Sequence, residues 1–199
     1  ITAQGHPENP KFQESFDVDA QEKIQKLLLD YIGFSWEKGA VGRTEHPFTL
    51  NFSSNDVRVT NHYYEKKPIS SIFSAIHEGG HALYELGVAD DLQYTYAANG
   101  VSMGIHESQS RFYENILGRN INFWKPIYSD IKSLLNLDLT LEEFVSELNN
   151  AHPSLIRTEA DELTYCFHII IRYEIERELF NGNINIDELP NIWNNKMKE

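Results

Sequence analysis

The most informative part of the chain is Ile69–Leu86, with the sequence ISSIFSAIHEGGHALYEL. Within it, His77, Glu78 and His81 form the pattern H-E-x-x-H. Because residues four apart lie one above the other on the same face of a helix, the two imidazoles can bind one Zn²⁺ together. The carboxylate that follows the first histidine can then act as a base toward water at the ion. The alternative is an ordinary amphipathic helix that carries two incidental histidines.

The residues around this motif predict a helix. Pro68 precedes the stretch, at a position where the start of a helix tolerates proline. Gly79 and Gly80 are unfavourable inside a helix, by about 1 kcal/mol each relative to alanine. We therefore expect the two glycines to make room for a neighbouring backbone or for a substrate. Apolar residues recur at helical spacing and predict one buried face: Ile69, Ile72, Phe73, Ile76 and Leu83.

The composition is that of an ordinary globular protein with an acidic surface. The chain has 199 residues, of which 41% are hydrophobic and 24% charged, enough for one well-buried core or at most two small domains. Its net charge is −13, from 17 basic and 30 acidic residues. This balance argues against a nucleic-acid partner, because nucleic acids select basic surfaces, whereas cationic peptides would be attracted.

Cysteine usage and the chain ends predict a location inside the cell. Cys166 is the only cysteine and cannot form an internal disulfide, so nothing indicates an oxidising compartment. No apolar run approaches transmembrane length, and the N-terminus does not resemble a signal peptide. We therefore expect a cytoplasmic protein that binds no membrane. Residues 1–17 are polar with two prolines and predict an extended arm; since the chain begins without methionine, we expect a piece of a longer one.

Residues 44–60 differ from their surroundings and predict two short strands or a hairpin, because apolar and polar residues alternate on both sides of a turn-like Ser-Ser-Asn cluster. In the second strand, this alternation places Asp56, Arg58 and Thr60 on one face. That face is either a solvated edge or one wall of a polar cleft. His46, ahead of these strands, is by itself consistent with an ordinary loop residue.

Residues 103–117 predict the helix that completes a metal site. Glu107 lies near its start, 26 residues after His81 (107 − 81). Two histidines from one helix and a carboxylate from the next make a His₂Glu zinc set, which leaves a fourth position for water. The alternative is an exposed ion pair between Glu107 and Arg111, four residues apart. Glu114 shares the same face and is either a second candidate ligand or a group that supports the ligands.

Further helices are expected at residues 19–32, 122–137, 141–148 and 152–180, with a last short helix at 187–198 that breaks at Pro190. Thr140 and Glu143 predict a capping box ahead of the helix at 141–148. The longest helix, 152–180, carries two lines of residues at helical spacing. One line is polar: Arg157, Asp161, Thr164 and His168. The line beside it is apolar: Ile156, Ala160, Leu163, Phe167, Ile170 and Ile171. The polar line is either a solvated face or, through Arg157 and Asp161, a preorganised anion site.

Five motifs together resemble the carboxypeptidase Taq family, the M32 metallocarboxypeptidases. In the order expected for that family they are HPF (His46–Phe48), DVRVT (Asp56–Thr60), HEGGHALYE (His77–Glu85), GIHESQSRFYEN (Gly104–Asn115) and IRTEADELTY (Ile156–Tyr165). The resemblance implies a mainly α fold, with a gluzincin-type helical metallopeptidase core and a small β-hairpin or sheet beside the active-site groove. Family members have further segments before and after this part, so residues 1–199 are expected to be a single catalytic-core region.

The resemblance also implies roles for individual residues. It implies one divalent metal per chain, Zn²⁺ or Co²⁺, held by His77, His81 and Glu107, with Glu78 as general base. It implies that Arg157 meets the C-terminal carboxylate of a substrate. Other residues are expected to line the groove and contact the substrate, His46 and Arg58, or to support the site: Asp56, Thr60, Arg111, Glu114 and Asp161.

The implied function is a metal-dependent carboxypeptidase that releases C-terminal amino acids from peptides and forms homodimers. One alternative is an endopeptidase or oligopeptidase on the same gluzincin site, which would accept a blocked C-terminus. The other is a non-catalytic metal-binding or dimerisation module. The sequence sets neither the preferred C-terminal residue nor the choice between Zn²⁺ and Co²⁺, because the same nitrogen and oxygen ligands suit both ions.

Overall fold

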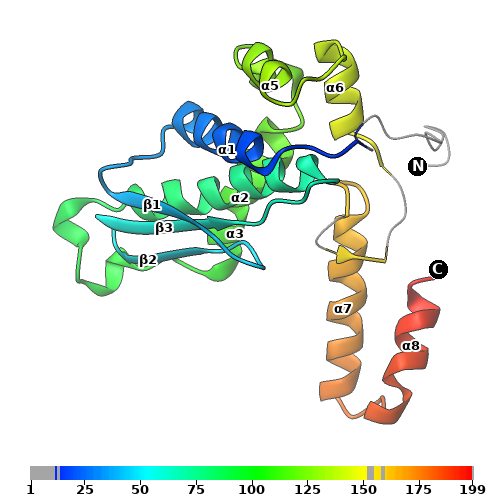
Figure 1. Ribbon diagram of the computed structural model, residues 1–199. Coiled ribbons are helices and arrows are strands. Elements are labelled where there is room, and N and C mark those ends of the chain that lie inside the picture. Colours follow the sequence, from blue (N-terminus) through cyan, green and yellow to red (C-terminus); the bar gives the residue numbers. More distant parts are fainter. Residues whose placement is uncertain (1–11, 13, 152–154, 158–159, 199) are drawn as a thin grey trace. The chain divides into compact units, whose positions relative to one another are not determined.

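Figure 1 shows a computed structural model of the chain, which describes residue 12 and residues 14–151, 155–157 and 160–198. The structure divides into two compact units, Asn9–Leu148 and the residues from Asn149 onward, which are described separately below. Helices dominate, and the strands form one small sheet. The predicted mainly α fold with a small sheet is therefore confirmed.

The H-E-x-x-H stretch forms the central helix of the larger unit, α2 (Pro68–Leu86), as predicted. Ile72, Phe73 and Ile76 are buried on its apolar face. The helix α1 (Val18–Ile32) packs along α2 and was also predicted. Its first turn is capped by the side chain of Asp17, and it ends at Gly33, whose φ of 94° is the left-handed conformation that glycine adopts readily.

Three strands form a mixed sheet in the order β1 (Gly39–Arg43), β3 (Asp56–Asn61), β2 (Thr49–Ser53). The antiparallel pair of β2 and β3 is the predicted hairpin. β1 pairs parallel to β3 and was not predicted, because its sequence GAVGR contains two glycines and little apolar alternation. β3 is therefore the central strand and not a sheet edge, although Arg58 and Asp56 on its polar face have exposed side chains, as the interpretation of a solvated face predicts.

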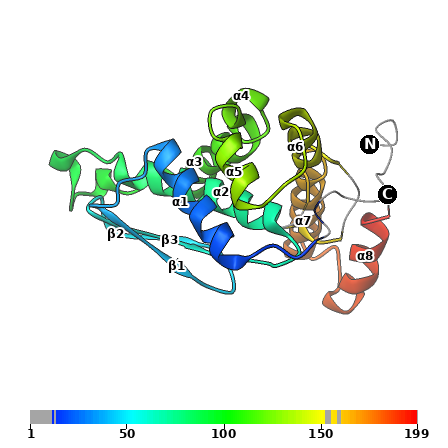
Figure 2. The same ribbon diagram turned by 45° about the horizontal axis from the view of Figure 1, so that its top comes forward.

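The register of the sheet decides which side chains reach α2. Val57 and Val59 of β3 are fully buried in a cluster with residues of α1 and α2, on the side of the sheet where Figure 2 shows these helices. Residues paired across strands point to the same face. Thr49 is paired with Val59 and Asn51 with Val57, so both β2 side chains face α2. Arg58, next to both valines in sequence, faces the opposite side.

The helix α3 (Met103–Arg111) packs against α2, and the side chain of Ser102 caps its start. A helix was predicted to continue regularly to Leu117, but the chain changes after Arg111 to a π-helix, Phe112–Leu117. The connection between α2 and α3 contains two short 3₁₀ turns, Asp90–Leu92 and Tyr96–Ala98. Glu107 lies in the regular part and Glu114 in the wider π-helical part.

The predicted single helix at 122–137 was wrong. Two short helices take its place, α4 (Ile121–Trp124) and α5 (Tyr128–Leu134), with Pro126 between them. Proline has no backbone N–H and its ring obstructs the preceding turn, which explains the interruption. The helix α6 (Leu141–Leu148) follows as predicted, and its capping box is present: the amide of Glu143 donates to Thr140 Oγ1 over 3.2 Å, and the amide of Thr140 donates to Glu143 Oε2 over 2.9 Å.

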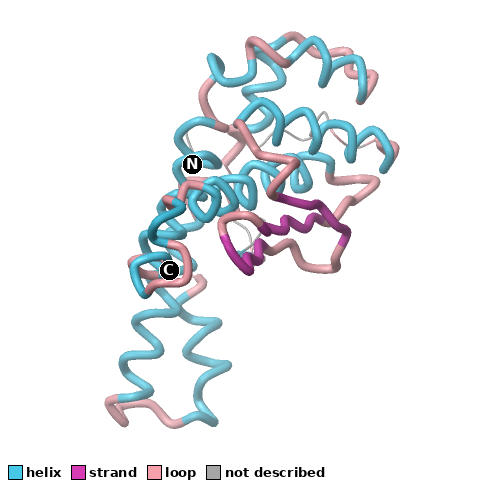
Figure 3. Tube along the Cα trace, turned by 90° about the vertical axis from the view of Figure 1, so that its left-hand side faces the viewer, coloured by secondary structure: helices cyan, strands magenta, loops and turns pink. Residues whose placement is uncertain are grey.

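The helices α1, α2 and α4–α6 enclose the main hydrophobic core, and Figure 3 shows the strands gathered on one side of these helices. Trp124, Ile131 and Phe144 are among its fully buried side chains. Phe12 and Phe16, from the end of the predicted extended arm, are also buried there; residues 1–11 and 13 of that arm lie outside the described residues. No helix in the described part of the chain combines the length and apolar character needed to cross a bilayer.

In the smaller unit, the helices α7 (Tyr165–Phe180) and α8 (Leu189–Lys196) run in opposite directions, joined through a 3₁₀ turn at Ile186–Glu188 (Figure 1). The predicted helix at 152–180 begins later than expected; residues 152–154 and 158–159 lie outside the described residues. Asp161 explains the late start, because its Oδ1 accepts the amides of Leu163 and Thr164 in a local turn that competes with helix. Pro190 lies in the first turn of α8, so the predicted break there was also wrong.

The polar line predicted on the longest helix is not solvated. Asp161, Thr164 and His168 are buried, whereas the apolar line beside it is largely exposed: Ile156, Leu163, Phe167 and Ile170. The interpretation of this line as a solvated face was therefore wrong.

The two mid-helix glycines of α2 face different neighbours. A Cβ on Gly79 would meet the ends of two α1 side chains, Ile32 Cδ1 at 2.5 Å and Leu29 Cδ2 at 3.0 Å. A Cβ on Gly80 would lie 2.8 Å from the backbone Cα of Ser110 in α3. Gly80 therefore allows the backbones of α2 and α3 to approach each other. This confirms, for Gly80, the expectation that a glycine makes room for a neighbouring backbone.

These contacts predict different costs for two otherwise identical substitutions. Gly79→Ala should be close to neutral, because flexible side-chain ends can move and alanine favours the helix by about 1 kcal/mol. Gly80→Ala should destabilise the protein by about 1–3 kcal/mol, because helix backbones must separate. Urea unfolding of both variants measures the difference. Equal free energies of unfolding for the two variants would contradict this account of the α2–α3 contact.

Candidate metal centre

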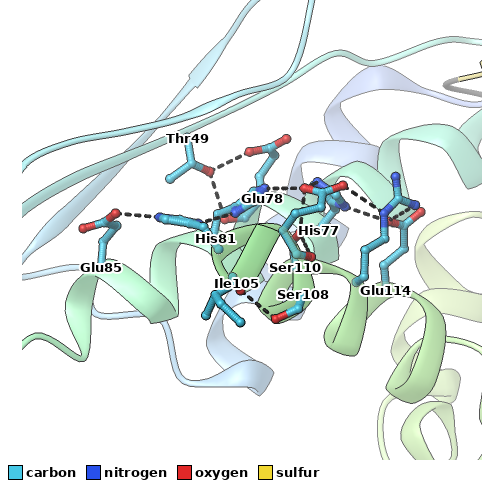
Figure 4. Close-up of polar contacts among 12 residues, drawn as sticks. Thr49, His77, Glu78, His81, Glu85, Ile105, Ser108, Ser110 and Glu114 are labelled. Carbon is cyan, nitrogen blue, oxygen red and sulfur yellow. Dashed lines mark hydrogen bonds and ion pairs between the residues drawn. The ribbon is translucent and has the colours of Figure 1, made fainter. Parts of the chain in front are cut away.

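Two helices bring three possible metal ligands together (Figure 4). His77 and His81 lie one turn apart on α2, and Glu107 projects from α3. Glu107 Oε2 is 3.5 Å from His77 Nε2 and 3.3 Å from His81 Nε2. One donor atom from each of the three residues lies within 4.8 Å of the other two, and within the described part of the chain this is the only such group.

The geometry of this group fits a divalent ion. Zinc lies about 2.1 Å from imidazole nitrogen and carboxylate oxygen, so two ligands of a tetrahedral ion are about 3.4 Å apart. The two distances from Glu107 Oε2 to the imidazole nitrogens are close to that value, and both exceed an ordinary hydrogen bond. Two imidazoles and one carboxylate are also a donor set that catalytic zinc sites use, with the fourth position open.

Glu107 and Glu114 share one arginine. Arg111 Nε donates to Glu107 Oε1 and Arg111 Nη1 to Glu114 Oε2, each over 3.0 Å. His77 Nδ1 lies 2.6 Å from Glu114 Oε2, which can accept its proton. Glu107 can therefore be both a metal ligand and the partner of Arg111, because Oε1 forms the ion pair with Arg111 while Oε2 faces the histidines. Glu114 lies behind His77 rather than among the three converging ligands.

A longer chain of side chains lies behind His81. His81 Nδ1 is 2.7 Å from His106 Nδ1, and His106 Nε2 is 2.6 Å from Glu85 Oε1. Asn51 Nδ2 donates to the other Glu85 oxygen over 2.6 Å. His81 and His77 are therefore both contacted through Nδ1, and both leave Nε2 directed at Glu107.

Glu78, between the histidines, is buried and is held by the sheet. The hydroxyl of Thr49 lies 2.6 Å from Glu78 Oε2 and 3.0 Å from the carbonyl oxygen of the same residue. Figure 4 shows this pair above the row formed by His81 and His77. Thr49 therefore holds the carboxylate of Glu78 through Oε2.

The charges of this group perturb its pKa values. Burial disfavours the charged form of His77, but the neighbouring carboxylates of Glu107 and Glu114 outweigh that effect and raise the pKa of His77 to about 9. Burial would likewise raise the pKa of Glu107, but the contacts with His77 and His81 and the charge of Arg111 hold that pKa well below its usual range. The metal-free site therefore keeps a proton on His77 at neutral pH.

Other residues implied by the resemblance make contacts outside the group of three possible ligands. Arg58 forms a two-bond ion pair with Asp56 on the side of the sheet that faces away from α2, and its guanidinium stacks on Phe52. Thr60 exchanges hydrogen bonds with the backbone of Phe48. His46 is exposed, and its carbonyl accepts a hydrogen bond from Thr44 Oγ1. Their expected roles in substrate binding or support stay predictions.

Arg157 and Asp161 belong to the smaller unit. Arg157 Nη1 donates to the hydroxyl of Tyr165 over 2.8 Å, and its guanidinium lies 5.7 Å from that ring's centroid. Asp161 accepts hydrogen bonds from the amide and the hydroxyl of Thr164, the residue just before α7. The proposed contact of Arg157 with a substrate carboxylate stays a prediction.

Sequence reasoning missed four residues of the site: Thr49, Asn51, Glu85 and His106. Two of them carried a local signal, since Glu85 follows His81 by four residues on the same helix and His106 directly precedes Glu107. The other two reach α2 through the register of β2, which depends on pairing between strands and cannot be obtained from the spacing of α2.

Comparisons with known proteins find similarity to metallopeptidases. The family model described as carboxypeptidase Taq (M32) metallopeptidase matches residues 1–199. The chain is similar to carboxypeptidase 1 of Bacillus subtilis, with 42% identity over 100% of this chain, and to thermostable carboxypeptidase 1 of Thermus thermophilus, with 38% identity over 97%. It also resembles the crystal structure of M32 carboxypeptidase from Deinococcus radiodurans, with a TM-score of 0.94 and 36% identity over 98% of this chain.

The matched regions are only parts of these relatives. This chain covers 40% of the Bacillus subtilis protein, 38% of the Thermus thermophilus protein and 40% of the Deinococcus radiodurans chain. It therefore spans about 40% of the length of the relatives it matches.

The raised pKa of His77 predicts how the stability of the metal-free protein depends on pH. A histidine whose folded pKa exceeds its unfolded value of 6.5 stabilises the fold fully below pH 6.5 and loses that contribution as the pH rises through about 9. Urea unfolding in the presence of a chelator measures this effect. The free energy of unfolding of wild type should exceed that of His77→Gln most at pH 6.5 and least above pH 9. A stability difference that stays constant or grows over this range would contradict the assignment.

Proposed function

The chain belongs to the carboxypeptidase Taq (M32) family of metallopeptidases, and we propose that it carries the metal centre with which such an enzyme releases C-terminal amino acids from peptides. The observation that carries the proposal is the convergence of His77, His81 and Glu107 on one point, beside the buried carboxylate of Glu78. We propose Zn²⁺ as the bound ion, with Co²⁺ as the second candidate, since both accept this donor set.

The chemistry divides between the ion and the protein. A bound divalent ion supplies Lewis acidity, which polarises a peptide carbonyl and makes nearby water acidic. Glu78 takes a proton from the attacking water at Oε1, the oxygen that Thr49 leaves open. As the water oxygen bonds to the carbonyl carbon and the C–N bond breaks, the same proton passes to the leaving amine.

Thr49 and Glu114 act by orienting these groups. The Thr49 hydroxyl fixes the rotamer of the Glu78 carboxylate, which keeps Oε1 available for proton transfer. Glu114 accepts the proton of His77 Nδ1, which leaves the lone pair of Nε2 for the ion.

The proposed preference for a free C-terminus rests on Arg157. An arginine can bind a carboxylate through two parallel hydrogen bonds, which would fix the last residue of the peptide and set the point of cleavage. His46 and Arg58 are proposed as further substrate contacts, with Asp56, Thr60, Arg111, Glu114 and Asp161 as residues that support the site. The runner-up function is an endopeptidase on the same metal centre, which would need no such carboxylate.

Peptides are the proposed substrates. A homodimer and a cytoplasmic location stay predictions from the sequence.

Replacement of Glu78 tests the proposed chemistry. Glu78→Gln keeps the size and the bond from Thr49 but cannot take a proton, so peptide release should fall about 10²- to 10⁴-fold. The zinc content of the purified variant, measured by atomic emission, should equal that of wild type, because Glu78 is not among the proposed ligands. Undiminished release by a zinc-loaded variant would show that Glu78 is not the base.

A pair of peptides distinguishes the two candidate functions. The protein should release the last residue of a free peptide and leave its C-terminally amidated form intact. Arg157→Ala should reduce this discrimination, whereas Arg172→Ala, a matched arginine of the same unit that stacks on Trp193, should preserve it. Cleavage of the amidated peptide by wild type at an equal rate would favour the endopeptidase. If wild type distinguishes the free from the amidated peptide and Arg157→Ala does so equally well, the proposed role of Arg157 is rejected.

A further inference from the structure

The two histidines of the metal centre are supported in different ways. A carboxylate lies directly behind His77, because Glu114 Oε2 is 2.6 Å from its Nδ1. Behind His81 a second imidazole intervenes, and the carboxylate of Glu85 follows it at 2.6 Å from His106 Nε2. Figure 4 shows Glu114 and Glu85 at the two ends of this row of contacts.

One arrangement of protons satisfies every contact behind His81. If His81 Nε2 has its lone pair directed at the ion, its Nδ1 carries the proton and donates to His106 Nδ1. His106 then carries its own proton on Nε2 and donates it to Glu85 Oε1. Asn51 donates to Glu85 Oε2, so both oxygens of the carboxylate are occupied. With His106 neutral and its proton on Nε2, the opposite tautomer of His81 would place two unprotonated nitrogens of these rings against each other.

The position of Glu85 is difficult to explain by packing alone. Its exposed fraction is only 8%, and burying a carboxylate is unfavourable unless hydrogen bonds compensate for the lost water. The contacts that compensate come from His106, which also contacts His81, and from Asn51. Ring contacts hold the plane of His106, because its centroid lies 4.6 Å from that of Tyr84 and 4.8 Å from that of His81.

We propose that Glu85 and His106 are positioning residues that hold His81 in the tautomer and ring orientation that presents Nε2 to the metal. The proposal rests on the proposed function for the identity of the site, and adds to it two residues that act only through His81. Asn51 of β2 donates a hydrogen bond to Glu85, so the sheet holds the end of this series of contacts that is farthest from the metal. Groups of this kind, behind a ligand, typically change metal affinity about 10- to 100-fold when removed.

Zinc affinity tests the proposal without use of activity. Zinc alone is titrated into metal-free protein in competition with a chromophoric chelator, for wild type, His106→Phe and Glu85→Gln. Both variants should bind zinc about 10- to 100-fold more weakly than wild type. The double variant should bind zinc only slightly more weakly than His106→Phe does, because the two residues act through one series of contacts. Tyr84→Phe, which keeps the ring beside His106, should bind zinc as wild type does.

The thermal stability of each metal-free variant separates positioning from structure. A fall in zinc affinity with a nearly unchanged melting temperature supports the proposal. A lowered melting temperature with unchanged zinc affinity assigns the two residues a purely structural role and overturns it. Unchanged affinity in both single variants overturns it as well.

Nitrogen NMR of the zinc-loaded wild type gives a readout that needs no variant to fold. His81 should show a proton on Nδ1 and the metal on Nε2, and His106 should show its proton on Nε2. Metal on His81 Nδ1, or a proton on His106 Nδ1, would overturn the proposal. If these results hold but no peptide is released, the proposed function fails and the positioning role stands.

Discussion

The close contact between α2 and α3 at Gly80 is the constraint on which the candidate site depends. A side chain there would meet the backbone of Ser110 and Gln109, so only glycine lets the two helices lie this close. One turn before Ser110, Glu107 then reaches across to the histidines that flank the glycine pair. The unfavourable Gly80 of α2 is thus explained by the site that it allows to form, whereas Gly79 faces side chains of α1.

Contacts within the fold hold the three proposed ligands in position. Each histidine is contacted at Nδ1 by a group behind it, and each therefore directs Nε2 toward Glu107. The strand β2 contributes from the other side, since Thr49 holds Glu78 and Asn51 holds Glu85. Preorganisation of this kind reduces the ordering that binding requires, which favours both metal affinity and a fixed position for the base.

The sequence predicted the parts of the site that depend on local spacing. His77, Glu78 and His81 follow from the period of one helix, and Glu107 from the start of the next. Thr49 and Asn51 escaped prediction because they reach α2 only through the pairing of β2 with β3, which is set by contacts distant in sequence.

Errors in the fold arose where one residue overrides a helical pattern. Pro126 divides the helix expected at 122–137. The side chain of Asp161 captures the amides of Leu163 and Thr164, which delays the start of α7. The buried polar line that includes His168 was misjudged because hydrophobic periodicity reports which residues are apolar, and not which face is covered.

The most direct test of the account is the anomalous scattering of a crystal soaked in zinc. We expect one strong zinc peak about 2.1 Å from His77 Nε2, His81 Nε2 and Glu107 Oε2. Zinc bound by the histidines with Glu107 turned away, or zinc bound elsewhere on the chain, would contradict the central claim.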